Sequence, residues 1–86
     1  MKKLDLDAIV PPLTLTVDGA RVRILEVIKL ELISGHKSYH VTLELTWRGK
    51  RSPRFFIDAK SWEDLVRKLL VEISKFKLAV IMGWTT

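Results

Sequence analysis

The chain has 86 residues, a mass of 9.9 kDa, a formal net charge of +5 and a pI of about 9.8. This length suits one small domain, and the apolar fraction of 48% predicts a globular chain and not a disordered one. The absence of cysteine excludes disulfides, thiolate metal sites and a cysteine nucleophile.

Residues 1–12 are expected to form an N-terminal arm, since Pro11 and Pro12 interrupt the backbone pattern that follows. Asp5 and Asp7 stand where a signal peptide would need an apolar run. The longest apolar run, residues 78–82, is far shorter than the roughly 20 residues that span a bilayer. We therefore expect a cytoplasmic protein with no membrane segment.

Residues 13–58 are predicted to form the sheet. Residues 13–17 alternate apolar and polar side chains, which is typical of a strand, and Asp18-Gly19 favours a type I′ hairpin turn. The chain returns through residues 20–33. Glu26 lies in the apolar register of that strand, which indicates a β-bulge nearby.

The clearest strand covers residues 39–48, where apolar residues from Tyr39 to Trp47 alternate with polar ones. It lies between turns at residues 34–37 and 49–53. A short fourth strand follows over residues 54–58. If this strand is regular, Phe55 and Phe56 point to opposite faces, and one of the two rings is available to a ligand or a second chain.

Residues 61–77 are predicted to form a helix that begins at Ser61, with Asp64 three residues later as a weak capping box. One apolar stripe contains Trp62, Leu65, Val66, Leu69, Leu70, Ile73 and Phe76. Residues 78–84 could extend the helix, add a strand or form a tail. Because Gly83 disfavours a helix that reaches the end, we expect an extended tail over residues 78–86 that covers the core or joins a subunit interface.

These elements predict an α+β fold in one domain: a four-stranded antiparallel meander, one long amphipathic helix packed on one face, and an extended apolar C-terminal tail. By alternation, the uncovered face presents Arg21, Arg23, Lys29, His40, Thr42, Thr46, Arg48, Arg54 and Phe56, with Leu25 and Val27 among them. Cations around exposed rings and apolar groups suit single-stranded nucleic acid, because cations follow phosphates and rings stack on unpaired bases.

The segment WRGKRSPRFF, residues 47–56, holds four basic and three aromatic residues and no acid. We expect phosphate contacts from Arg48, Lys50, Arg51 and Arg54, stacking by Trp47 and Phe56, and further contacts from Arg21, Arg23 and His40. For Trp47 the alternative is a ring that caps the core, as Tyr39 would at the other end of the same row. For the whole surface, the alternative is a salt-bridged face without a ligand.

Other chemistry finds little support in the sequence. His36 and His40 are four residues apart, a spacing that brings ligands together on a helix but not on a turn that leads into a strand. With no cysteine or nearby carboxylate to complete a site, we expect no metal and no cofactor. Ser34, Ser38, Asp58 and His40 have catalytic functional groups in no recognisable arrangement, and there is no glycine-rich phosphate loop. We therefore expect no enzyme activity.

The chain contains no Asn and no Gln, which is typical of proteins from hyperthermophiles. Over residues 13–76, the four strands, long helix and basic aromatic hairpin resemble the DNA-binding domain of the ThermoDBP group, single-stranded DNA-binding proteins of hyperthermophilic archaea. The resemblance implies a cleft with an apolar floor and basic edges, to which Arg48, Lys50, Arg51, Arg54, Trp47 and Phe56 would correspond. Longer members add a C-terminal helical segment that oligomerises, which this sequence lacks, so the resemblance also implies weaker binding.

The function expected from the sequence is binding of single-stranded DNA or RNA with little sequence preference. A protein-interaction or self-assembly module is the first alternative, in which the chain forms a homo-oligomer through its tail or an edge strand. A basic regulatory domain that reads duplex DNA with a β-ribbon is the second.

Overall fold

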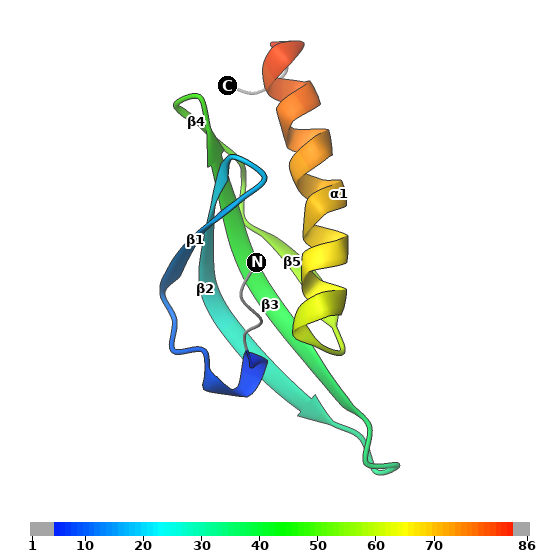
Figure 1. Ribbon diagram of the computed structural model, residues 1–86. Helices are drawn as coiled ribbons and strands as arrows, with labels where there is room; N and C mark the ends of the chain where they lie inside the picture. Colours follow the sequence, from blue (N-terminus) through cyan, green and yellow to red (C-terminus); the bar gives the residue numbers. More distant parts are fainter. Residues whose placement is uncertain (1–4, 84–86) are drawn as a thin grey trace.

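The computed structural model describes residues 5–83, which form one antiparallel sheet with a long helix on one face (Figure 1). In chain order the elements are η1 (Leu6–Ala8), β1 (Leu13–Val17), β2 (Ala20–Glu31), β3 (Lys37–Trp47), β4 (Lys50–Arg51), β5 (Phe55–Ala59) and α1 (Trp62–Ile81). The predicted α+β fold is confirmed. The structure adds the two-residue strand β4 to the four strands expected.

The β1–β2 hairpin turns at Asp18 and Gly19, which both have positive φ, as a type I′ turn requires. The expected bulge is present as a register shift between Ile24 and Glu26. After the bulge, the side chains of β2 point to the opposite faces from those that simple alternation would give. Val27 and Lys29 therefore lie on the helix side, opposite Val41 and Tyr39. The expectation that these two side chains share the uncovered face was therefore wrong.

Strand β3 is the centre of the sheet, with β2 on one side and β4 and β5 on the other. Its inward side chains are buried from Tyr39 to Leu45 and pack against the buried stripe of α1, which contains Trp62, Leu65, Leu69, Ile73 and Phe76. Leu6 of η1, which belongs to the N-terminal arm, is buried and packs as part of the core. The sheet buries one face under the helix, as alternation predicts.

Helix α1 begins after Ser61, whose side chain accepts a hydrogen bond from the backbone amide of Asp64, and continues to Ile81. The extended conformation expected from residue 78 onward is thus wrong for residues 78–81. Val80 packs against the core, and this contact favours one more helical turn over a tail. Gly83, with φ of +75°, then ends the helix as a left-handed residue. Residues 84–86 of the expected tail lie outside the described residues.

The molecule is elongated, with principal extents of 45 × 22 × 19 Å. The β2–β3 hairpin continues past the N-terminal end of α1, so its tip has no helix over it (Figure 1). Within residues 5–83, no helix is both long and apolar enough to cross a membrane.

Candidate nucleic-acid interface

The sheet face that points away from α1, here called the outer face, consists of short rows of side chains that run across the strands. The strand pairing defines five rows: Thr16, Arg21, Thr46 and Arg51; Thr14, Arg23 and Glu44; Glu26, Thr42 and Phe56; Ile28, His40 and Asp58; Leu30 and Ser38. Cations lie in the first and second rows, and aromatic rings lie in the third and fourth. Aliphatic side chains lie in the fourth row, beside His40, and in the fifth. The outer face therefore changes from basic to aromatic and then to apolar along β2 and β3.

A hollow of about 250 Å³ lies over the two basic rows and is here called the arginine hollow. Its lining residues are Pro12, Thr14, Arg21, Arg23, Glu44, Thr46 and Arg51. Three of them carry guanidinium groups, which bind phosphate oxygens in a planar, bidentate geometry. The hollow thus collects positive charge from two strands, β2 and β4, which lie on either side of β3.

Glu44 is the single carboxylate in this hollow, and its side chain is only 11% exposed. Its two oxygens lie 3.9 Å from Arg23 Nη1 and 4.0 Å from Arg54 Nε. A carboxylate this buried requires paired cations, and these two arginines provide them. Glu44 therefore lies between two guanidinium groups on the outer face, and it also offsets part of their charge. The sequence already placed Glu44 in register with polar outward residues, but gave it no role.

Beside the arginine hollow, Phe56 exposes 64% of its surface, although it lies within strand β5 and is paired with Thr42. Its ring stacks on the imidazole of His40, with centroids 4.6 Å apart and planes at 28°. His40 Nδ1 in turn lies 2.6 Å from Asp58 Oδ1. The carboxylate therefore fixes the imidazole, and the imidazole fixes the phenyl ring, which leaves a flat aromatic surface open to solvent.

Phe55 and Phe56 point to opposite faces, as the sequence predicted. Phe55 is half-buried and packs against the core, so Phe56 is the ring available on the outer face.

Three predicted site residues lie elsewhere. Trp47 continues the inward row of β3 and is half-buried against the core, in agreement with the alternative of a core cap. The Arg48 guanidinium lies 4.3 Å from the centre of the Trp47 ring, and Lys77 Nζ lies 5.3 Å from it. Lys50 is paired with Trp47 in β4, which places it on the helix side as well. The predicted cluster is thus divided between the two faces of the sheet.

The loop between β4 and β5 sets the positions of Arg51 and Arg54. Ser52 Oγ accepts a hydrogen bond from the Leu45 backbone amide at 2.8 Å and donates one to the Pro53 carbonyl at 2.9 Å. The Ser52 amide also donates to the Leu45 carbonyl at 2.8 Å. Ser52 therefore holds the chain to β3 between two strands, and the arginines on both sides of it reach the outer face.

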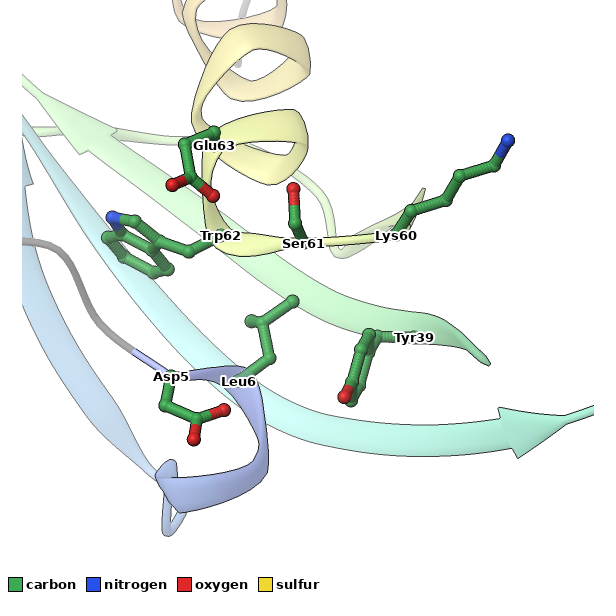
Figure 2. A pocket seen from close by; sticks show the side chains of 7 residues that line it. All are labelled: Asp5, Leu6, Tyr39, Lys60, Ser61, Trp62 and Glu63. Atoms are coloured by element: carbon green, nitrogen blue, oxygen red, sulfur yellow. The ribbon is translucent and has the colours of Figure 1, made fainter. Parts of the chain in front are cut away.

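A larger hollow, of about 510 Å³, lies at the N-terminal end of α1, between the arm and β3 (Figure 2). Its floor contains Leu6, Tyr39 and Trp62, all of which are buried. Asp5, Glu63 and Lys60 contribute to its rim, and Figure 2 shows the Lys60 side chain pointing away from the hollow. The floor offers little ring surface for stacking, and the carboxylates do not attract phosphates.

The arm beside this second hollow is fastened by Asp7. Lys29 Nζ lies 3.3 Å from Asp7 Oδ1, and hydrogen bonds from the Tyr39 hydroxyl and from Lys29 lower the pKa of Asp7. Burial, and then the hydrogen bond to Asp7, raises the pKa of Tyr39. These groups are engaged with one another and serve to attach the arm to the sheet.

Among residues 5–83, no three side chains of the types that bind metals lie together. His36 Nδ1 lies 2.8 Å from Ser34 Oγ in the hairpin tip, while His40 is with Asp58 on the outer face. No family model matches the chain, and neither a curated protein nor a solved structure is significantly similar to it.

Proposed function

We propose that the outer face binds single-stranded nucleic acid with little sequence preference and without catalysis. The observation that carries the proposal is the exposed Phe56 ring, supported by His40, one row away from the Arg23–Glu44–Arg54 group on an uncovered sheet. An exposed ring beside guanidinium groups is the combination that single-strand binders use, since every base has a face that can stack.

The two parts of the surface have separate roles in this proposal. Arg21, Arg23 and Arg51 around the arginine hollow, with Arg54 beside it, bind phosphates and release the counterions around them. The Phe56–His40 pair stacks on an unpaired base. A duplex offers its phosphates but not its base faces, so the aromatic surface favours single strands. Because Glu44 already pairs with Arg23 and Arg54, phosphates must compete with a carboxylate, which predicts a modest affinity.

The first experiment measures anisotropy of a labelled single-stranded oligonucleotide of about 20 nucleotides at several salt concentrations, with unlabelled duplex as competitor. If each of the four arginines neutralises one phosphate, the logarithm of the binding constant should fall with the logarithm of the salt concentration with a slope no steeper than about −3. We expect binding that weakens with salt and resists the duplex. Equal competition by duplex would instead favour a β-ribbon reader, and absence of binding at low salt would overturn the proposal.

Variants locate the site. Phe56→Ala removes the stacking ring and should weaken binding by about 1 to 3 kcal/mol, or roughly 5- to 150-fold. Arg51→Glu/Arg54→Glu should abolish binding at moderate salt. The matched control is Lys60→Glu/Lys75→Glu, which changes the net charge equally at exposed positions that do not line the arginine hollow. If this control weakens binding as much as the arginine variant, net charge and not the outer face is responsible.

A further inference from the structure

The second half of β2 has a free edge. Strand β1 pairs with β2 only as far as the Leu13–Ile24 pair, and Pro11 and Pro12 precede Leu13. Proline has no amide hydrogen to continue the ladder. In the part of the chain that the structure describes, no strand pairs with β2 beyond Ile24 on this side. The backbone groups on this side of β2 have no partner strand among the described residues, so they can pair with a strand of another chain.

This free edge is also unusually apolar. Ile28 and Leu30 on the outer face are 42% and 49% exposed, and Leu32 just beyond the strand is 58% exposed. Ile28 and Leu30 lie on the outer face, which points away from α1, so the helix does not cover them. A long edge strand with exposed aliphatic side chains is a site for pairing with another chain.

We propose that β2 pairs antiparallel with β2 of a second copy, about a twofold axis at Leu30. If the twofold axis is perpendicular to the sheet, the two copies of β2 run antiparallel and both outer faces lie on the same side of the joined sheet. The residue at the axis then lies opposite the same residue of the second copy. With Leu30 at the axis, Lys29 lies opposite Glu31 in both directions, and Ile28 lies opposite Leu32. Centring the pair on Lys29 or on Glu31 would instead place like charges opposite each other, which destabilises a strand pair.

Charge complementarity thus favours a second copy as the partner and favours the register centred on Leu30 over the two registers next to it. Lys29 is paired with Asp7 within the chain but keeps 40% of its side chain exposed, so its ammonium group can also reach a second carboxylate. The pairing would place Ile28, Leu30 and Leu32 of both copies side by side in one continuous apolar strip on the joined outer face, where neighbouring side chains shield one another from water in part. The two arginine hollows would lie at opposite ends of the joined outer face. This assembly does not depend on nucleic-acid binding, although joined sites would gain avidity.

Single cysteines test the register, because the chain has no cysteine of its own. Leu30→Cys should form a disulfide-linked dimer under mild oxidation, since residues directly opposite in an antiparallel pair lie about 4.5–5.5 Å apart, within disulfide range. Ile28→Cys and Leu32→Cys should cross-link when mixed, but neither should cross-link alone. Leu78→Cys, on the exposed side of α1, is the matched control. Faster cross-linking of Leu78→Cys than of Leu30→Cys would place the interface on the helix and overturn the proposal.

Mass in solution tests the charges independently. Wild-type protein should show a dimer in sedimentation equilibrium, and Glu31→Lys should weaken the dimer at least about tenfold. The charge swap Lys29→Glu/Glu31→Lys is combined with Asp7→Asn, because Asp7 would otherwise face a like charge at position 29. This triple variant should restore the dimer, since opposite charges again face each other across the pair. Thermal unfolding of each variant verifies that the monomer is folded. A wild-type chain that is monomeric up to about 1 mM, or a triple variant whose dimer is as weak as that of Glu31→Lys, would refute the strand pairing.

Discussion

The hydroxyl group of Ser52 provides a hydrogen-bond partner for β3 in the gap between its pairing with β4 and its pairing with β5. It satisfies the buried amide of Leu45 between the end of β4 and the start of β5. Without it the Leu45 amide would have no partner from that loop, and the arginines on either side would lose their fixed positions. Ser52 is thus both a structural residue and a positioning residue for the outer face.

Replacing Ser52 should therefore affect both stability and binding. We expect Ser52→Ala to lower the free energy of unfolding by about 1 to 3 kcal/mol, because a buried amide is left without its acceptor. Urea denaturation measures this loss. Ser74→Ala, an exposed serine within α1, is the control and should be neutral or slightly stabilising. Equal effects of the two substitutions would mean that the hydrogen bond to Leu45 contributes nothing.

At the scale of elements, helix α1 is stabilised at its start by Asp64. The Lys60 backbone amide donates to its carboxylate at 3.1 Å, and with hydrogen bonds from Arg67 and Lys68 this lowers the pKa of Asp64 from 3.8 to about 2. A carboxyl group whose pKa is lower in the folded chain stabilises it fully above about pH 4, and this stability is lost as the pH falls toward about 2.

Asp64→Asn keeps an acceptor but removes the charge. We expect the free energy of unfolding to fall by about 1 kcal/mol near neutral pH, since charge-assisted hydrogen bonds are lost. Between about pH 4 and 2 the variant should lose less further stability than the wild type, because the titrating group is absent. Urea denaturation at a series of pH values measures both curves. Parallel curves across this range would show that Asp64 does not titrate abnormally.

The last turn of the same helix can be tested in a similar way. Val80 packs against the core, while Leu78 is exposed. Val80→Ala should therefore cost about 1 kcal/mol of unfolding free energy, and Leu78→Ala less than about 0.5 kcal/mol. Thermal or urea denaturation of the two variants provides the comparison. The reverse order would mean that residues 78–81 do not pack as the helix does.

At the scale of the whole molecule, the positive charge is distributed over both faces of the sheet. Arg21, Arg23, Arg51 and Arg54 gather on or beside the outer face, while Arg48 and Lys77 stack against Trp47 on the helix side. A net charge of +5 attracts polyanions in general, but among residues 5–83 the largely exposed aromatic side chain, Phe56, lies beside the cations of the outer face. The proposed interface therefore depends on which side chains share a face and not on the total charge.

Periodicity predicted most of the architecture. The alternation of residues 13–17 and 39–47, the Asp18-Gly19 turn, the bulge near Glu26 and the apolar stripe after Ser61 are each local signals, and each corresponds to an element in the structure. Local signals suffice there because a half-buried strand and an amphipathic helix impose different periods on the sequence. Six of the nine predicted site residues also lie on or beside the outer face: Arg21, Arg23, His40, Arg51, Arg54 and Phe56.

The sequence alone determined the four longer strands, the helix and their order, together with the fact that Phe55 and Phe56 lie on opposite faces of β5. Tertiary structure decided the rest, because a bulge or a turn shifts every later side chain by one step. The bulge moved Lys29 inward, and the pairing of β4 with Trp47 moved Lys50 to the helix side. Only packing against the core extended the helix to Ile81, and only the meeting of β2, β3 and the loop before β5 set Glu44 between Arg23 and Arg54.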